Sequence, residues 1–538
     1  MKIKYLFLLL LSFSCVAEVI VLDNITAYSA ENGQIKKTNT LIFDTNTGLI
    51  LEDSAKNRQQ GKRVDAQGAI VLPGLIDAHG HVLEYGLGRI EAQLRDINTL
   101  EQTLNTIKRY ADENPNNSWI IGRGWNQVLW TDTNGFPNRQ HLDTLVTDKP
   151  VWLSRVDGHA GWANSKALEL AGIDKAMAAD NDLIIKDQNG EPTGILIDNA
   201  MRRINEVLPQ PSQLDKIKAF KVAFTELAAA GLTSVHDAGI GLDSHALYQQ
   251  LAQQDAIPIR IYAMLDGSYS QLKDLLAPGH TNIKDRYIVR SVKMMIDGAL
   301  GSYGALMHQP YSDKTDTTGA YVMSREHLEN NLKQVVEHGF QANIHAIGDR
   351  GNSEVIDLLS QKWADSKTLR HRVEHAQIMR LEDILRLQRN HIIASMQPTH
   401  ATSDMNMAEN RIGAARIKGG YAWKTIEDSG VVIASGSDFP VELFNPFFGL
   451  HAAVTRQNRQ DQPTGGWYAN EAMDIEQAFK TFTIHAAYAA HMEDKIGNLE
   501  VGKYADFIII NQDIFTIDKS KIWSTQVLET WVSGRKIH

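Results

Sequence analysis

Two histidines near residue 80 have a spacing that suits them to bind a metal ion. Residues 72–81 read LPGLIDAHGH, an apolar run that ends in His79 and His81. If residues 71–78 are extended, side chains two positions apart project to the same side. Two neutral imidazoles on one face can hold zinc or a similar ion. Because a His-x-His pair also arises by chance, two polar loop residues are the alternative for this pair alone.

Further candidates end other apolar runs. Lys293 lies inside VKMMID, where a buried and unpaired ammonium would be costly. It must therefore be neutralised, chemically modified, or paired with an acid such as Asp297 by extending its stem. His345, His375 and Asp438 each follow a run of their own. A lone residue of this kind is usually structural, but six of them, distributed over five of these apolar runs, indicate a shared site.

The elements that must position these residues alternate in type. Helical periodicity covers residues 213–230, 325–338 and 381–390, and lies between apolar runs of strand length. There are eight such runs, at residues 70–78, 231–238, 258–265, 291–297, 339–346, 371–376, 391–397 and 430–437. Eight strands alternating with helices predict an α/β fold, a parallel (β/α)8 TIM-like barrel. Chemistry in such barrels lies at the C-terminal ends of the strands, where the candidates fall.

The rest of the chain predicts two additions to the barrel. Short β-type runs at both ends, over residues 19–25, 41–43, 49–51, 497–513 and 527–537, predict a small β-sandwich built from both chain ends. The segment 88–212 is too long for one helical crossover and predicts an inserted subdomain with a strand at 150–156. Its Trp125, Trp130 and Trp162 either line an apolar substrate pocket or form the core of the subdomain.

The predicted boundaries follow from this pattern. They are a signal peptide at 1–17, β-sandwich segments at 18–72 and 491–538, the barrel at 73–87 and 213–490, and the insertion at 88–212. Lys2 and Lys4, an apolar stretch and small residues before Glu18 make up the signal. We therefore expect an exported protein, periplasmic or secreted. Lipidation of Cys15, the only cysteine, is the alternative.

Composition excludes some partners. The 538 residues carry a net charge of −10, which argues against nucleic acid or an anionic membrane surface. No later stretch reaches the roughly 20 apolar residues of a membrane-spanning helix, so we expect no membrane insertion after processing. A small molecule is the expected partner, and the sequence carries no signal of oligomeric state.

The motifs together resemble one family. They are PGLIDAHGH at 73–81, DGHA at 157–160, Lys293 with Asp297-Gly298, His345, Glu374-His375, QPTH at 397–400, GSDFP at 436–440 and GNLEVGKYADF at 497–507. The chain resembles the amidohydrolase superfamily, and within it the amidohydrolase-3 family that includes N-substituted formamide deformylases. The resemblance runs from the predicted β-sandwich strands to the C-terminus.

The resemblance implies a role for each candidate. His79 and His81 would bind the more buried metal together with Asp438, and His345 and His375 would bind a second ion. Lys293, carboxylated by CO2, would become a carbamate that bridges the two. The cofactor would be one or two divalent ions, with zinc favoured, although His and carboxylate ligands accept other metals.

Five other polar residues are candidates to contact the substrate. Asp157 and His159 lie in the insertion, His236 and Asp237 close the second strand, and His400 follows the seventh. The alternative for the first pair is a structural turn. His236, Asp237 and His400 could instead orient the metal ligands.

The resemblance also implies a reaction. A metal-activated hydroxide would attack a carbonyl carbon, and Asp438 would carry the proton to the leaving nitrogen. We therefore expect an exported metal-dependent hydrolase of non-peptide C–N bonds in amide, formamide or N-acyl compounds. The alternatives are a deaminase of a cyclic amidine, against which Lys293 argues, and a non-catalytic regulatory protein that binds metal.

Overall fold

The computed structural model describes residues 18–133, 135–156, 160–181 and 183–538, and these fall into two compact units. The first unit holds the described residues up to Gly80, Leu227–Asp438 and Glu442–His538. The second holds His81–Glu226 and Phe439–Val441. Among the described residues, no helix combines the length and apolarity needed to cross a membrane.

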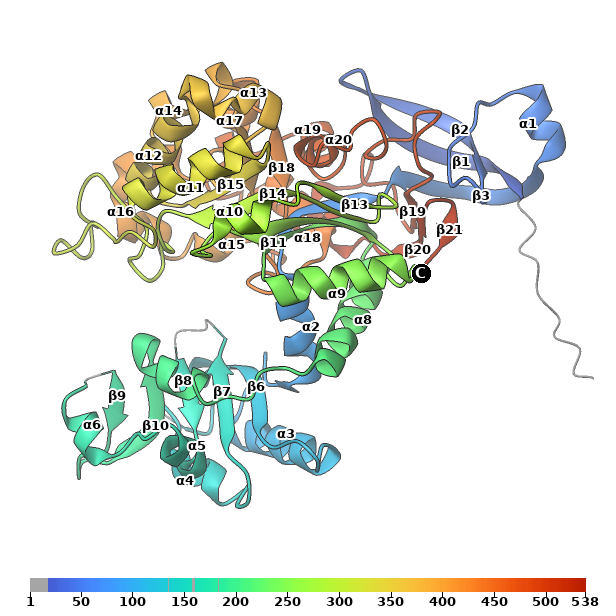
Figure 1. Ribbon diagram of the computed structural model, residues 1–538. Coiled ribbons are helices and arrows are strands. Elements are labelled where there is room, and N and C mark those ends of the chain that lie inside the picture. The colour runs from blue at the N-terminus through green and yellow to red at the C-terminus, as the bar shows by residue number, and fades with distance from the viewer. Residues whose placement is uncertain (1–17, 134, 157–159, 182) are drawn as a thin grey trace, which may run out of the picture. The chain divides into compact units, whose positions relative to one another are not determined.

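Eight parallel strands of the first unit form a barrel sheet (Figure 1). In spatial order they are β4 (Leu75–Gly80), β11 (Leu232–Ile240), β12 (Arg260–Asp266), β14 (Tyr287–Met295), β15 (Gln341–Ala346), β16 (Arg372–His375), β17 (Ile393–Met396) and β18 (Ile433–Ser435). The short β13 (Thr281–Ile283) pairs with β14. The predicted fold class, a TIM-like barrel with flanking β-structure, is confirmed.

The two outer strands of this sheet meet just past β18. The backbone N–H of Asp438 donates to the carbonyl oxygen of His79 at 2.7 Å. The Ser437 hydroxyl donates to Asp77 at 2.6 Å. The barrel is therefore nearly closed, and its closing contacts lie at the C-terminal ends of β4 and β18.

The prediction of one strand over residues 70–78 is wrong. The segment contributes to two strands, β3 (Lys62–Pro73) in another sheet and β4 in the barrel. Gly74 separates them, and its backbone packs so closely on Thr233 that an added Cβ would lie 2.1 Å from the Thr233 hydroxyl. Periodicity cannot separate two strands that follow one another directly here, because the residues on both sides of Gly74 are apolar and buried.

Helices cover the outside of the barrel. α11 (Arg325–Glu337) packs on β14 and β15, and α12 (Asp349–Leu359) packs on β15 and β16. The helices predicted at 325–338 and 381–390 are confirmed as α11 and α14 (Leu381–Arg389). The helix predicted at 213–230 is confirmed as α8 (Gln213–Ala229), most of which belongs to the second unit. The remaining helices of the first unit are α1 (Ala55–Gln60), α9 (Leu242–Gln253), α10 (Leu272–Leu276), α13 (Ser366–Leu369), α15 (Pro398–Asp404), α16 (Ala408–Arg416), α17 (Trp423–Asp428), α18 (Pro446–Thr455), α19 (Ile475–Thr481) and α20 (Ile484–Ala489).

Strands from both chain ends form one six-stranded sheet. Its order is β2 (Gln34–Asp44), β1 (Val19–Glu31), β3, β19 (Phe507–Ile510), β20 (Val527–Val532) and β21 (Arg535–Lys536). β3 and β19 pair antiparallel, with Ile70 opposite Ile510. Buried side chains such as Phe43 and Phe507 form the core beneath this sheet.

A buried ion pair links this sheet to the barrel, and we call it the Arg260–Asp506 joint. Arg260, at the start of β12, places Nε 2.7 Å and Nη2 3.0 Å from the two carboxylate oxygens of Asp506. Arg260 also donates to the Ser533 hydroxyl at 2.8 Å and lies over the ring of Tyr504. Both charged side chains are 3% exposed, so the pair is almost fully removed from water.

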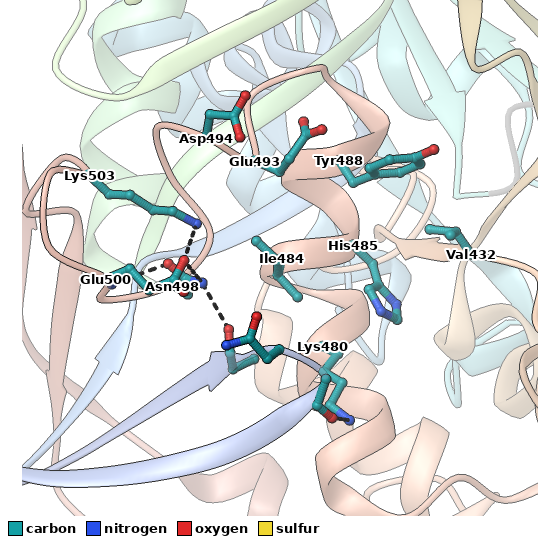
Figure 2. A pocket seen from close by; sticks show the side chains of 13 residues that line it. Val432, Lys480, Ile484, His485, Tyr488, Glu493, Asp494, Asn498, Glu500 and Lys503 are labelled. Atoms are coloured by element: carbon teal, nitrogen blue, oxygen red, sulfur yellow. Dashed lines mark hydrogen bonds and ion pairs between the residues drawn. The ribbon is translucent and has the colours of Figure 1, made fainter. Parts of the chain in front are cut away.

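A cavity of about 400 Å³ lies between the turn of the six-stranded sheet and helix α20 (Figure 2). The Lys480 ammonium donates to the carbonyl oxygen of Gly33 at 2.7 Å. The Asn498 amide donates to the carbonyl oxygen of Ala30 at 2.9 Å. Since none of the site residues predicted from the sequence lines this cavity, it does not contribute to the candidate site.

The second unit carries a six-stranded sheet of its own. Its strands, in spatial order, are β5 (Ala92–Gln93), β6 (Ile120–Trp125), β7 (Val151–Arg155), β8 (Ala160–Ala163), β10 (Pro192–Ile197) and β9 (Ile184–Lys186). Its helices are α2 (Val82–Ile90), α3 (Leu100–Glu113), α4 (Arg139–Asp143), α5 (Ser165–Leu170), α6 (Lys175–Ala179) and α7 (Arg202–Asn205). Trp125, Trp130 and Trp162 are buried together in its hydrophobic core, which favours the core interpretation of these residues.

Candidate metal centre

Six polar side chains gather at the C-terminal end of the barrel strands, and we call them the ligand cluster. They are His79, Lys293, His345, His375, Asp438 and His400. Strands β4, β14, β15 and β16 carry the first four, while Asp438 follows β18 and His400 lies in α15 after β17. Because parallel strands end at the same edge of a barrel, residues far apart in sequence meet here.

Three members of the ligand cluster form a set that could hold an ion. Donor atoms of His79, His375 and Asp438 all lie within 4.8 Å of one another, and all three residues are buried. His375 and Asp438 have φ angles of +73° and +60°, in the left-handed region that costs energy for residues with a Cβ. Backbone strain at two adjacent donors is typical of a functional site.

The His79 ring is held on both sides. Its Nδ1 makes a short hydrogen bond to Glu374. Its Nε2 lies 3.0 Å from the Lys293 Nζ and 3.5 Å from an Asp438 carboxylate oxygen. Since Glu374 accepts the Nδ1 proton, the lone pair on Nε2 faces the other members of the cluster.

The remaining cluster residues complete the site. The rings of His345 and His375 lie 4.5 Å apart, and His375 Nδ1 contacts the side-chain oxygen of Gln397 at 2.8 Å. The His400 Nε2 lies 3.8 Å from Asp438 Oδ2. Nε2 of both His345 and His400 is buried and has no hydrogen-bond partner among the described residues. Since buried nitrogen atoms of this kind normally find a partner, these two fit a bound ion or substrate.

Burial keeps the cluster histidines neutral. Desolvation, with help from Lys293, lowers the pKa of His79 to about 4 and that of His345 to about 3. Burial and the neighbouring His345 hold the pKa of His375 well below its ordinary value. Burial also lowers the pKa of the Lys293 ammonium. Neutral imidazoles offer lone pairs, so this donor set fits a divalent metal ion.

Lys293 does not pair with Asp297, the partner considered from the sequence. The Asp297 carboxylate accepts hydrogen bonds from the backbone N–H groups of Leu306, Ile347 and Gly348 at 2.7, 3.0 and 2.8 Å. It thereby ties the segment after β14 to the end of β15. Over the described part of the chain, no carboxylate forms an ion pair with Lys293.

His236 and Asp237, predicted to contact the substrate, and His81, predicted to bind metal, make contacts of other kinds. His236 is fully buried inside the barrel, where its Nδ1 accepts a hydrogen bond from Arg372 at 3.0 Å. The Asp237 carboxylate accepts from the Tyr248 hydroxyl of α9 at 2.6 Å. His81 precedes α2 and belongs to the second unit, where its backbone N–H donates to Phe439. Asp157 and His159 lie outside the described residues.

Sequence reasoning assigned no role to Arg372 and Glu374. Both side chains are 0% exposed, and Arg372 Nε lies 2.7 Å from Glu374 Oε1. Burial alone would raise the pKa of the Glu374 carboxyl, but Arg372 and His79 outweigh burial and hold it below its usual range. The sequence did contain a signal for this pair. Two charged residues at alternate positions of a buried strand face the same side, and their charges need partners there.

Comparisons with known proteins agree with this geometry. The amidohydrolase family model matches residues 62–538. The Bacillus subtilis protein YtcJ, which is named as an amidohydrolase, is 30% identical over 489 residues, covering 89% of this chain and 90% of YtcJ. N-substituted formamide deformylase of Arthrobacter pascens is 25% identical over 494 residues, covering 88% of this chain and 89% of that enzyme.

Solved structures extend the likeness to the fold. A metal-dependent hydrolase of Pyrococcus horikoshii superposes with a TM-score of 0.77 at 26% identity, covering 93% of this chain and 99% of that protein. The barrel, the buried donor set and a family match over most of the chain lead to one conclusion. This chain belongs to the amidohydrolase family.

Proposed function

We propose that this protein is a metal-dependent hydrolase that cleaves a non-peptide C–N bond in an amide, formamide or N-acyl compound. The observation that carries this proposal is the buried donor set of His79, His375 and Asp438, beside which the His400 Nε2 lies without a hydrogen-bond partner among the described residues. The names of YtcJ and of the formamide deformylase support a C–N bond as the target.

His79, His375 and Asp438 would hold the ion. His345 and Lys293 are the residues of the first unit that we expect to complete the set, the lysine as a carbamate formed with CO2. A ligand role for His81 stays a prediction from the sequence. A buried lysine amine with a lowered pKa supports this modification, because CO2 reacts with the neutral amine. A bound divalent ion would polarise a carbonyl group and lower the pKa of water.

Asp438 and His400 would act on the substrate. The Asp438 carboxylate accepts a proton from the attacking water and delivers it to the leaving nitrogen, so that the C–N bond breaks to give a carboxylic acid and an amine. His400 Nε2 lies 3.8 Å from Asp438 Oδ2, close enough for both groups to meet one substrate. His400 would donate a hydrogen bond to a polar substrate atom and orient it.

An activity screen tests the reaction class. Protein loaded with Zn²⁺ is incubated with an N-alkyl formamide, an N-acyl amino acid, a cyclic amide, an ester and a cyclic amidine, and carboxylate, amine and ammonium are quantified. We expect carboxylate and amine from at least one amide, and loss of both after chelation of the metal. Ammonium released from the amidine alone would instead identify a deaminase.

The N-terminal residues support export as a further part of the proposal. Lys2, Lys4 and the apolar stretch before Glu18 have the order of a signal peptide. Expression of the full chain in a bacterial host, followed by fractionation and N-terminal sequencing, tests this. We expect a mature chain outside the cytoplasm that begins at Glu18. An unprocessed cytoplasmic chain contradicts export, and fatty-acid labelling of Cys15 would indicate a lipoprotein.

A further inference from the structure

We propose that Arg372 and Glu374 form a buried positioning pair that holds His79 in its metal-binding orientation before an ion arrives. The pair lies on β16, the strand that also carries His375 of the ligand cluster. Glu374 accepts a short hydrogen bond from His79 Nδ1, and both side chains are 0% exposed. The carboxylate therefore selects the tautomer whose Nε2 lone pair points toward Lys293 and Asp438.

Arg372 extends this support across the barrel. It lies on β16 and reaches the Ala78 carbonyl oxygen on β4 at 2.6 Å and the Ser395 hydroxyl on β17 at 2.7 Å. It also donates to His236 on β11 at 3.0 Å. The guanidinium thus contacts three other strands, and on β4 it contacts the residue immediately before His79. The orientation of His79 is coupled to the barrel frame.

Energetics favour a positioning role over a purely stabilising one. Burying two charges costs several kcal/mol per ion, and well-packed apolar residues of the same volume often stabilise a fold equally well. The Arg372–Glu374 pair has a property that apolar residues lack, because its carboxylate retains spare acceptor capacity for a histidine N–H. A carboxylate behind a metal-binding imidazole also makes the ring a stronger ligand.

Zinc affinity of folded variants tests the pair. Glu374→Gln keeps the shape of the side chain but removes its charge. We expect Zn²⁺ affinity, measured by competition with a chromogenic chelator, to fall about 10- to 100-fold. We also expect the visible spectrum of the Co²⁺-loaded variant to shift, because the His79 ring changes orientation.

Asp506→Asn is the matched control. It removes one charge from the Arg260–Asp506 joint, which is also buried but contacts no member of the ligand cluster. We expect this variant to lose stability and to keep wild-type Zn²⁺ affinity. If both variants lose affinity equally, or if Glu374→Gln keeps wild-type affinity, the pair does not position His79.

A second variant covers the case in which Glu374→Gln does not fold. Glu374→Asp keeps the charge that Arg372 needs but withdraws the carboxylate from His79 by the length of a methylene group, so wild-type Zn²⁺ affinity in this variant would also contradict the proposal. The inference rests on the metal site of the proposed function. Wild-type protein that binds no metal would overturn that site itself, whereas unchanged affinity in the variants overturns only the positioning pair.

Discussion

The first unit buries polar groups in two regions that differ in how completely those groups are paired. In the Arg260–Asp506 joint, both oxygens of the carboxylate contact the guanidinium, and the Ser533 hydroxyl accepts a further hydrogen bond from Arg260. In the ligand cluster, Nε2 of His345 and His400 has no hydrogen-bond partner among the described residues. An unpaired buried polar atom costs about 1–3 kcal/mol. Two such atoms within one group of metal-binding side chains indicate that something outside the chain completes the ligand cluster.

The sharpest test of this difference is Asp438→Asn. The amide cannot accept and return the proton that hydrolysis requires, so we expect turnover to fall at least a hundredfold, within the about 10²–10⁴ range of acid–base catalysis. Steady-state kinetics on the best amide substrate measures this, with bound zinc quantified in the same sample. Near-normal turnover at full metal content would remove Asp438 from the mechanism.

Lys293→Ala separates metal binding from folding. If the carbamate is a metal ligand, the variant should lose bound metal while its circular dichroism spectrum stays unchanged. Added formate or acetate should restore part of the activity by replacing the carbamate. Full metal content in Lys293→Ala would show that the lysine is not a ligand.

At the Arg260–Asp506 joint we expect a substitution to lower stability and to leave metal binding unchanged. Arg260→Met leaves the Asp506 carboxylate buried without its partner, so we expect the free energy of unfolding to fall by about 3–5 kcal/mol. Zn²⁺ affinity and turnover per folded molecule should not change. Urea denaturation measures the stability, and Lys284→Met, which breaks an exposed ion pair with Asp255, is the control with no expected change. Loss of metal in Arg260→Met would erase the difference between the two regions.

A pH-dependent prediction concerns His371, a fully paired histidine outside the ligand cluster. Its Nδ1 accepts the Ala342 N–H at 2.9 Å and its Nε2 donates to the Ala364 carbonyl oxygen at 2.7 Å. Burial lowers its pKa to about 4, whereas the unfolded chain binds the proton near pH 6.5. Below pH 6.5 only the unfolded state gains that proton, so the contribution of His371 to stability, complete above pH 6.5, is lost between pH 6.5 and about 4.

When the unfolded state is fully protonated, the free energy of unfolding has fallen by about 3 kcal/mol. We expect His371→Gln to be less stable than the wild type at pH 7.5, and the difference to shrink as pH falls toward 4.5. Urea denaturation of metal-free protein at several pH values measures it. A constant difference at all pH values would show that His371 titrates normally in the folded state.

Much of this fold could be predicted from the sequence. Alternating strand and helix patterns predicted the barrel, and strand-end positions predicted His79, Lys293, His345, His375 and Asp438 as neighbours. The break at Gly74 was missed because the close approach of Thr233 that requires a glycine is a tertiary contact. The link from Arg372 to Glu374 and His79 was missed. Burying an unpaired charge is costly, and this argument, which singled out Lys293, applies equally to two charges on one buried strand.

The sheet that joins both chain ends has a consequence for biosynthesis. β3 pairs with β19, so the early strands lack their partner until nearly the whole chain has been made. Pairings between such distant residues form slowly, and an unpaired strand edge promotes aggregation until they do. In a nascent chain, β1–β3 therefore lack their β19 neighbour while the barrel strands are being made. Truncation after the barrel would expose the edge of β3, and with it a surface that chaperones recognise.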